Sequence, residues 1–449
     1  MMSAAHLITN FTTAVKENDI PTHVIESAKL HFADAIGVGL AASAGTMQKR
    51  WYGSVGKGGS ATCIGGNSSS PADAALLNGM LIHSLEYDDT HTSSVIHGSA
   101  VAAPSALAAA EEANCSGAEM LIGYILAYEI MIRIGLAAPG MFQKNGFQVT
   151  SIAGSIATAA ITCRLHGLSQ EVTENAIGIA GSQASGLLAF LENGSSVKAL
   201  NPGWAAHIGI KAVQLSKSGM TGPPGILENP LGVMKSFART SGNLLDQLGD
   251  LGQVWHSQNA AFKLYPCCHY IHPFLEAIEG LLQDGLTARD VDKIHLKVAN
   301  AQAPLICEPW DRKQNPLSGY DAKWALPYCI ALLLIKGKID VHSFEKKPSK
   351  PVIELAKKIE WTPMKNSGFP NVFPAYVRVK RKDSSVADIT IHDVKGTASR
   401  PVEPNLIKQK FLENTARKLD ESTRNDFWNS LLEITQFQSI KNISSMLKC

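Results

Sequence analysis

Residues 100–134 read AVAAPSALAAAEEANCSGAEMLIGYILAYEIMIRI, and this stretch sets the expected architecture. Its pattern predicts two helices, over residues 100–113 and 117–134, that are apolar on nearly every face. Helices of that kind are buried on all sides, so we expect both to lie inside a larger helical bundle. Glu129 and Arg133 stand one helical turn apart, which favours a buried, ion-paired helix over a membrane span.

Similar segments extend the bundle on both sides of this stretch. Pro21 and Pro71 open two of them, as is common in the first turn of a helix. Apolar residues recur at three- and four-residue spacings, and small residues occupy positions that are usually polar, which allows helix axes to approach closely. The expected helices cover residues 21–36, 74–85, 151–165, 172–180 and 204–216.

After about residue 285 the pattern changes to that of a mixed α and β region. Residues 293–298 alternate between apolar and polar side chains, and residues 375–381 and 386–392 flank a turn-like segment, which predicts a β-hairpin. Further helices are expected at residues 322–335, 341–344, 351–358, 405–419, 422–434 and 440–447.

The charge distribution also divides the chain, near residue 250. Residues 1–250 hold 13 Lys and Arg against 18 Asp and Glu, whereas the remainder is basic. We therefore predict a fold that is mostly α with a smaller α+β domain. A large all-helical domain covers residues 1–255, a smaller α+β domain covers residues 256–402, and the helices of residues 403–449 pack back on the first domain.

Composition excludes several classes of protein. The 449 residues are 45% hydrophobic and only 18% charged, which indicates a closely packed protein and not a disordered one. With a net charge of +2 and no long basic run, nucleic acid is not an expected partner. The N-terminus lacks a signal-peptide pattern and the eight cysteines form no disulfide framework, so we expect a cytoplasmic location, reduced thiols and no membrane partner.

The densest polar cluster is LEYDDTH, residues 85–91, followed by HGSA at residues 97–100. It lies between two apolar helices, and its three carboxylates and two histidines offer either acid–base groups or ligands for a divalent metal. His97 also precedes a helix, whose N-terminus favours a bound anion. The alternative is a solvated loop in which Asp89 or Thr90 caps the helix.

Two lysines are candidates for binding carboxylates. Lys198 stands in a stretch with few other cations, and Lys263 precedes CCHYIH, residues 267–272. A lysine can bind a carboxylate as a point charge, although most lysines are exposed to solvent. The Cys-Cys-His-x-x-His pattern lacks a second paired half with zinc-like spacing, so it is a weak metal motif.

Two further polar residues lie beside expected helices. Gln148 can donate and accept hydrogen bonds but cannot act as an acid or base at neutral pH. Tyr328 can donate its hydroxyl to an oxyanion or carboxylate, although a tyrosine in a core is the commoner case. The sequence contains no P-loop, no GxSxG elbow and no convincing dinucleotide-binding glycine motif.

Together these segments resemble the MmgE/PrpD family over nearly the whole chain. The matching motifs, in order, are LIHSLEYDDTH (81–91), HGSA (97–100), GSQASG (181–186), KALNPGWAAHIG (198–209) and FKLYPCC (262–268). The family includes 2-methylcitrate dehydratase, cis-aconitate decarboxylase and iminodisuccinate epimerase. The resemblance implies a large helical domain with a smaller lid-like α+β domain, a homodimer, a small polycarboxylate substrate, and no metal or organic cofactor.

The resemblance also implies site residues. Compared with the decarboxylase branch, Glu86 stands where an aspartate is expected, and Gln148 and Cys268 stand where histidines are expected. These departures concern acid–base groups, so they bear most on decarboxylation. The positions carried over as catalytic are His97, Asp89, Glu86 and Tyr328, and those carried over as substrate-binding are Lys198, Lys263, Thr90, Gln148, His269 and Cys268.

The expected function is that of a cofactor-independent hydro-lyase acting on a small citrate-like polycarboxylate. Lys198 and Lys263 would bind carboxylates and stabilise an enolate-like anion. His97, oriented by Asp89 or Glu86, would move the proton, and the tyrosine of the smaller domain would complete the site on closure. Three alternatives stay open: an epimerase of an iminodisuccinate-like dicarboxylate, a cis-aconitate decarboxylase, and a catalytically inactive polycarboxylate-binding protein.

Overall fold

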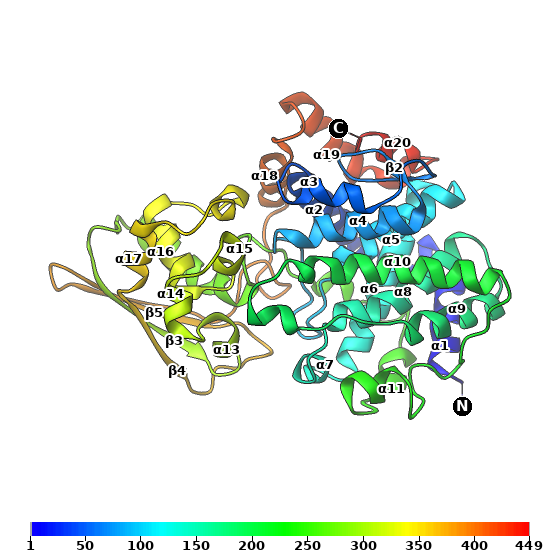
Figure 1. Cartoon of the computed structure of the whole chain (residues 1–449), viewed down its shortest axis with the longest axis horizontal. Helices are drawn as coiled ribbons and strands as arrows, with labels where there is room; N and C mark the ends of the chain where they lie inside the picture. Colours follow the sequence, from blue (N-terminus) through cyan, green and yellow to red (C-terminus); the bar gives the residue numbers. More distant parts are fainter. Residues whose placement is uncertain (1, 449) are drawn as a thin grey trace.

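The computed structural model describes residues 2–448 and shows a large helical body beside a smaller part that holds a sheet (Figure 1). The long helices of the body are α1 (Ala4–Ala14), α2 (Thr22–Ser43), α4 (Pro71–Ser84), α5 (Ser99–Ala113), α6 (Gly117–Leu136), α8 (Val149–Leu165), α9 (Gln170–Ser182) and α10 (Val197–Lys217). Shorter elements fill the connections: α3 (Gln48–Trp51), α7 (Met141–Lys144), α11 (Leu244–Gly249), β1 (Ala61–Thr62) and β2 (Ser68–Ser69). The helices predicted before residue 250 are all present, and α10 begins earlier than predicted.

Small residues bring the central helices close together. α10 packs against α4 and α8. A methyl group at Gly79 of α4 would lie 2.6 Å from the Cα atom of Gly203, and one at Gly209 would lie 2.4 Å from Thr158 of α8. Both distances are below van der Waals contact, so glycine is required at these crossings. The close packing holds α10 in place, and the first turn of this helix carries Lys198.

The smaller part is built on a four-stranded mixed sheet with the strand order β4-β3-β5-β6. Its strands are β3 (Val291–Ala299), β4 (Ile359–Met364), β5 (Ala375–Arg381) and β6 (Val386–Ile391). β3 is parallel to β4 and antiparallel to β5, and β5 and β6 form the predicted hairpin. The sequence analysis missed β4, a largely exposed edge strand in which Pro363 is tolerated because the edge needs fewer hydrogen-bond donors.

Short helices complete this part of the chain, and the one over residues 272–283 packs on β5 and β6. They are α12 (His272–Gln283), α13 (Ala303–Ile306), α14 (Trp310–Gln314), α15 (Gly319–Ala322), α16 (Leu326–Lys336) and α17 (Lys350–Ala356). The helix predicted over residues 322–335 is present as α16 but begins four residues later, because the chain breaks between α15 and α16. Pro327 lies in the first turn of α16, where a proline marks the start of a helix.

Two hydrophobic cores underlie the two parts. The first combines the body with the C-terminal helices α18 (Pro404–Thr415), α19 (Glu421–Leu432) and α20 (Lys441–Ser445). α18 and α19 pack on α2, where Phe411 lies against Gly37. The second core runs from Tyr265 to Val379. The C-terminal helices therefore return to the body, while the domain boundaries at residues 255 and 402 stay predictions.

The most apolar of the long helices of the body, α6, is an internal helix. Glu129 and Arg133 are both buried in it, with Arg133 Nε 3.7 Å from Glu129 Oε2. Across residues 2–448, none of the helices is long and apolar enough to cross a bilayer.

Candidate active site

A cavity of about 500 Å³ lies where the helical body meets the smaller part. Its walls include the loop between α4 and α5, the first turn of α10 and the segment after residue 262. Eight of the residues predicted from sequence line it: Glu86, Thr90, His97, Gln148, Lys198, Lys263, Cys268 and His269. Motifs that are far apart in the chain therefore converge on one site.

Glu86 is the main anionic group in the cavity wall. It follows α4 in a left-handed conformation (φ 56°) and is fully buried. Its two carboxylate oxygens each lie 2.5 Å from Lys198 Nζ, Lys263 Nζ lies 3.7 Å from Oε2, and the Tyr320 hydroxyl donates to Oε1 at 3.1 Å. Burial alone would raise the pKa of Glu86, but the two ammonium groups outweigh it and lower the pKa to about 2. The carboxylate is therefore ionised and shared between two cations.

Lys198 is held by helix α10 and by an aromatic ring. The sequence pattern left open a solvated loop lysine, but α10 begins at Val197, so Lys198 lies in its first turn. Its Nζ is 4.5 Å from the ring centre of Trp324, within the range of a cation–π interaction. The residue is only 4% exposed. Lys198 is therefore a buried charge in a defined position.

His97 belongs to a second polar group in the cavity wall. Its Nδ1 lies 3.1 Å from the backbone oxygen of Asp89, 3.1 Å from Thr90 Oγ1 and 3.6 Å from a carboxylate oxygen of Asp88. When Nδ1 donates its proton to the Asp89 carbonyl, Nε2 keeps its lone pair. Burial lowers the pKa of His97 well below its usual value, although Asp88 opposes the shift. The imidazole is therefore neutral near pH 7 and available as a base.

Asp88 connects His97 to a chain of buried side chains. His83 Nδ1 lies 2.8 Å from Asp88 Oδ2, and Gln148 Nε2 lies 3.2 Å from His83 Nε2. Asn201 in turn donates to Gln148 Oε1 at 2.8 Å. Burial would raise the pKa of Asp88, but the charge and hydrogen bond of His83 hold it below its usual range. Gln148 thus positions His83, a task that needs no titratable group.

Asp89 does not orient His97 through its side chain. Its carboxylate accepts hydrogen bonds from the backbone N–H (3.1 Å) and the hydroxyl (2.5 Å) of Ser99, at the first residue of α5. The carboxylate satisfies a free donor at the N-terminus of α5, as the capping alternative expected, but the loop is buried and not solvated, since Asp89 is 1% exposed. Glu86, the other expected carboxylate, is bound to the lysines. The carboxylate beside His97 is that of Asp88.

The structure brings a different tyrosine to Glu86. Tyr328 lies on α16 outside the cavity, and its hydroxyl accepts a hydrogen bond from the backbone N–H of Ser349 at 3.3 Å. Tyr320 of α15 instead donates to Glu86. The two tyrosines lie on opposite sides of the break between α15 and α16, and the sequence analysis predicted no helix at Tyr320.

Lys323 binds the backbone of the loop that carries Glu86 and the backbone of the segment around Pro266. Its Nζ donates to the backbone oxygens of Leu85 (2.5 Å) and Pro266 (3.0 Å). Burial lowers the pKa of Lys323 to about 8, although Glu86 opposes the shift. Because Lys323 lies between α15 and α16, the smaller part of the chain helps to hold a loop of the body.

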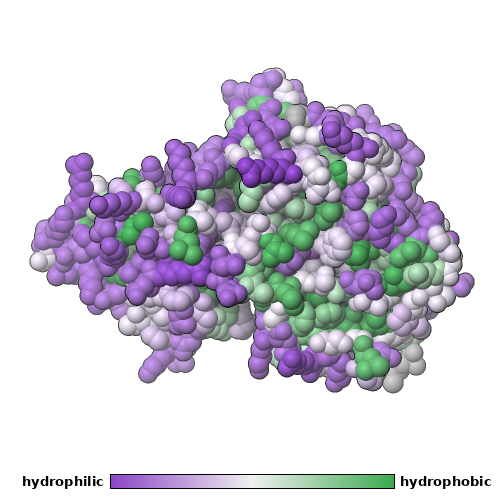
Figure 2. Space-filling view, in the orientation of Figure 1, coloured by the Kyte–Doolittle hydropathy of each residue, from purple (hydrophilic) through white to green (hydrophobic). Residues whose placement is uncertain are grey.

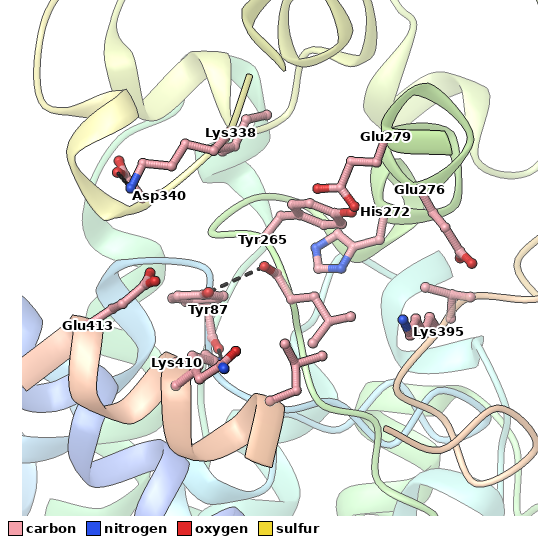
Figure 3. A pocket seen from close by; sticks show the side chains of 15 residues that line it. Tyr87, Tyr265, His272, Glu276, Glu279, Lys338, Asp340, Lys395, Lys410 and Glu413 are labelled. Carbon is pink, nitrogen blue, oxygen red and sulfur yellow. Dashed lines mark hydrogen bonds and ion pairs between the residues drawn. The ribbon is translucent and has the colours of Figure 1, made fainter. Parts of the chain in front are cut away.

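Lys410 of α18 makes a similar connection. It lines a second cavity, and Figure 3 shows it beside Tyr87 there. Its Nζ donates to the backbone oxygens of Tyr87 and Lys263, at 2.9 Å each, and lies 2.8 Å from Asp34. Sequence analysis missed Lys323 and Lys410, since no local signal marks a lysine that binds backbone oxygens of distant segments.

Cys268 and His269 lie where the resemblance implied a histidine, and both line the cavity. Burial raises the pKa of Cys268 to about 12, so its thiol stays protonated and is a poor nucleophile. Burial also lowers the pKa of His269 to about 3, and neither ring nitrogen has a hydrogen-bond partner among residues 2–448. Buried polar atoms are normally paired, and a bound ligand would supply the missing partner.

One group of side chains has the composition of a metal site. Ligand atoms of His83, Asp88 and His97 all lie within 4.8 Å of one another. Imidazole and carboxylate ligands suit zinc and several other divalent metals. The side chains of His83 and Asp88 already share a hydrogen bond, so the group has a role with or without a metal.

Comparisons with known proteins match this architecture. Residues 6–243 match the MmgE/PrpD N-terminal domain, and residues 265–433 match the MmgE/PrpD C-terminal domain. The chain is 26% identical over 470 residues to a cis-aconitate decarboxylase of Aspergillus terreus (strain NIH 2624 / FGSC A1156), covering 98% of this chain and 95% of that protein. It is 26% identical over 392 residues to a cis-aconitate decarboxylase of Homo sapiens, covering 84% of this chain and 78% of that one. With both domains matched in order, the chain belongs to the MmgE/PrpD family.

Proposed function

We propose that this protein is a cofactor-independent lyase that removes water from a small citrate-like polycarboxylate. The observation that supports the proposal is a neutral imidazole, that of His97, in one cavity with the buried ammonium groups of Lys198 and Lys263. A neutral imidazole can take a proton from carbon. The ammonium groups can stabilise the negative charge that develops on the neighbouring carboxylate.

The steps balance without a co-reactant. Nε2 of His97 takes a proton from the carbon beside a substrate carboxylate. The electron pair delocalises into that carboxylate and then forms the carbon–carbon double bond as the hydroxyl leaves the adjacent carbon. The hydroxyl takes the proton from the His97 imidazolium and departs as water. The imidazole is neutral again, and the product is an alkene.

The charges in the cavity explain how a polycarboxylate would bind. Among the residues that line the cavity, Lys144, Lys198 and Lys263 are cations and Glu86 is the one carboxylate, so the lining carries positive charge for an anion. The unpartnered ring of His269 and the hydroxyl of Thr90 can donate to further substrate oxygens. Substrate carboxylates would therefore meet cations at one end of the cavity and neutral donors beside them.

Decarboxylation is the second candidate, and the relatives favour it. The Aspergillus terreus and Homo sapiens proteins are both cis-aconitate decarboxylases. That reaction releases carbon dioxide, and an acid must then protonate the carbon that keeps the electron pair. A neutral His97, with Gln148 in place of an expected histidine, offers no such acid at neutral pH. For that reason we place dehydration first.

Proton NMR in heavy water separates the candidate reactions. Purified protein would be incubated with 2-methylcitrate, citrate, cis-aconitate and aminated succinates. New alkene signals from the citrates would support dehydration, whereas an alkene product from cis-aconitate with release of carbon dioxide would support decarboxylation. Loss of an α-proton signal without a new alkene would indicate an epimerase. No reaction, combined with a ligand-induced rise in melting temperature, would indicate an inactive binding protein.

A pair of variants tests the assignment of the base. His97→Gln should lower kcat by about 10²–10⁴-fold, the usual contribution of a general base, and should preserve ligand binding. His342→Gln is the matched control, since the His342 side chain is 55% exposed, pairs with Glu345 and lies outside the cavity lining. Full activity in His97→Gln would show that another group moves the proton.

We also propose that two copies pair through the outer face of α10, as expected for the family. Val197, Trp204 and Leu215 are 39–45% exposed and lie on one face of the helix, since their spacings are close to whole numbers of turns. Figure 2 shows apolar side chains gathered over this part of the body. Light scattering should give a dimer for the wild type and a monomer for Trp204→Glu. A wild-type monomer would contradict the proposal.

A further inference from the structure

We infer that the second cavity, which Lys410 lines, binds a small organic ammonium ion and that this ligand influences the candidate active site. The cavity has a volume of about 330 Å³ and is bordered by α12, by α18 and by the segments that carry Tyr87 and Asp340. It shares none of its lining residues with the active-site cavity. The inference therefore concerns a separate site and goes beyond the proposed function.

The charges of the wall leave one carboxylate in excess. The lining holds the carboxylates of Glu276, Glu279, Asp340 and Glu413 and the ammonium groups of Lys338, Lys395 and Lys410. Lys410 is bound to Asp34 at 2.8 Å, and Glu276 is bound to Arg400 at 2.6 Å, and neither of these partners lines the cavity. Three carboxylates then face two lysines, so the cavity favours a cation over an anion.

The arrangement of these carboxylates does not suit a metal ion. Figure 3 shows Asp340 and Glu413 on one side of the cavity and Glu276 and Glu279 on the other. A metal needs ligand atoms that converge on one point. Among residues 2–448, the only convergent group of His, Cys, Asp or Glu side chains is the one around Asp88 in the active site. The expected cation is therefore a molecule that spans the cavity.

His272 of α12 adds an acceptor that lacks a donor. Its Nε2 lies 3.3 Å from the backbone oxygen of Cys267, which can only accept, so Nε2 carries the proton. Burial lowers the pKa of His272 well below its usual value, so the ring is neutral and Nδ1 keeps its lone pair. This buried Nδ1 has no hydrogen-bond partner within residues 2–448. Figure 3 shows the ring pointing from α12 toward the middle of the cavity, where an N–H donor would complete it.

The rest of the lining can cover a short carbon skeleton. It includes the rings of Tyr87 and Tyr265 and the aliphatic side chains of Leu264, Ile339, Val394 and Leu406. A volume of about 330 Å³ is at the lower end of the range of ligand pockets, about 300–1,000 Å³. A primary ammonium group on a few carbons offers one positive charge, three N–H donors and an apolar surface, and thus matches each feature of the wall.

The second cavity adjoins the backbone that carries two charged groups of the active site. Tyr87 follows Glu86 in the chain, and Leu264 follows Lys263. The Tyr87 hydroxyl donates to the backbone oxygen of Leu264 at 3.3 Å, and Lys410 Nζ donates to those of Tyr87 and Lys263. A cation held against these residues should therefore strengthen the binding of an anion in the active site, and by linkage the anion should strengthen the binding of the cation by the same factor.

Three ligands of similar size test the chemical class. Calorimetric titrations would compare butylammonium, 1-butanol and butyrate on the whole protein. Butylammonium should bind at least about tenfold tighter than either of the others, because hydrogen bonds that involve a charged group are the stronger ones. Equal or tighter binding of 1-butanol or butyrate would overturn the inference, and so would the absence of any binding of butylammonium.

A double variant tests the location. Glu279→Gln with Glu413→Gln should weaken butylammonium binding about fivefold or more, since it removes two of the three available carboxylates. The matched control is Glu403→Gln, which removes an exposed carboxylate at the start of the same helix, α18, outside the cavity lining. Equal affinities in the double variant and the control would overturn the inference.

The influence on the active site has its own readout, which rests on the proposed polycarboxylate site. Saturating butylammonium should raise the affinity for succinate about twofold or more in the wild type and in Glu403→Gln, but not in the double variant. An unchanged succinate affinity in the wild type would overturn the proposed influence. A protein that binds butylammonium but never binds succinate would count against the proposed function and leave the ammonium site standing.

Discussion

Glu86→Gln removes one negative charge from the cavity while keeping the shape of the side chain. In the wild type this fully buried carboxylate is bound by Lys198 and lies close to Lys263. Breaking a buried ion pair by neutralising one partner costs about 3–5 kcal/mol, because the other charge stays buried without compensation. The pKa of Glu86 gives a similar magnitude, since a shift from 4.5 to about 2 corresponds to about 3 kcal/mol.

Thermal and denaturant unfolding would measure this loss. For a cooperative unit of about 300 residues, the unfolding entropy of roughly 0.6 kcal/mol/K converts 3–5 kcal/mol into a Tm decrease of about 5–8 °C. The matched control is Glu354→Gln, which breaks a solvent-exposed ion pair with Lys357 and should leave Tm nearly unchanged. Succinate should stabilise Glu86→Gln more than the wild type, because its carboxylates then meet lysines without a competing anion. Equal Tm values for the two variants would refute the electrostatic account of Glu86.

The pH dependence of the unfolding free energies of wild type and Glu86→Gln gives a second test. The folded-state pKa of Glu86 is lowered, so its contribution to stability is complete above pH 4.5 and is lost as the pH falls from 4.5 toward about 2. The difference in unfolding free energy between wild type and Glu86→Gln should stay constant from pH 7 to about 5 and shrink below 4.5. If the difference in unfolding free energy stays constant down to pH 3, the ionised carboxylate of Glu86 is not the cause of that difference.

Neighbouring groups lead to further predictions. Lys410→Met should lower the unfolding free energy by about 3–5 kcal/mol, because it leaves Asp34 buried without its partner. In denaturant titrations, the double variant Lys410→Met/Asp34→Asn should recover part of that loss. A double variant as unstable as Lys410→Met would contradict this prediction. Gln148→His places a titratable ring near His83. The ratio of the decarboxylation rate on cis-aconitate to the dehydration rate should then rise roughly tenfold or more. An unchanged ratio would argue against a role for this position. Because burial holds the pKa of His97 well below 6.5, kcat/KM should stay level as the pH falls through 6.5, and an acid limb centred there would be the contrary result. Excess chelator should leave turnover unchanged; a loss that one divalent metal restores would identify the His83–Asp88–His97 group as a metal site.

Much of the fold could be predicted because the spacing of apolar residues along the chain follows which faces of each helix or strand are buried. The helices of the body are apolar on most faces, and β5 and β6 alternate around a short turn. β4 escaped prediction because most of its side chains are exposed. The start of α10 was missed because Pro202 suggests a loop, whereas the structure accommodates this proline inside the helix.

The site was partly predictable for a different reason. The motifs that carry Glu86, His97, Lys198 and Lys263 are compact in sequence, so their members could be named before their spatial relations were known. Which carboxylate faces which partner depends on backbone geometry, such as the left-handed conformation at Glu86, and residue types do not encode it. For that reason Asp88 could not be separated from its neighbour within the motif.

The anchoring of the Glu86 loop connects the stability of the chain to its chemistry. Glu86 belongs to the body, but Tyr320 and Lys323 of the smaller part hold its carboxylate and the backbone oxygen just before it. Lys410, which returns from the C-terminal helices, holds the backbone on the other side of Glu86 and that of Lys263. Because the charges of the site are positioned by contacts between the two parts, a change that loosens these contacts should reduce kcat without touching the substrate. A site made only from the helical body would tolerate such changes.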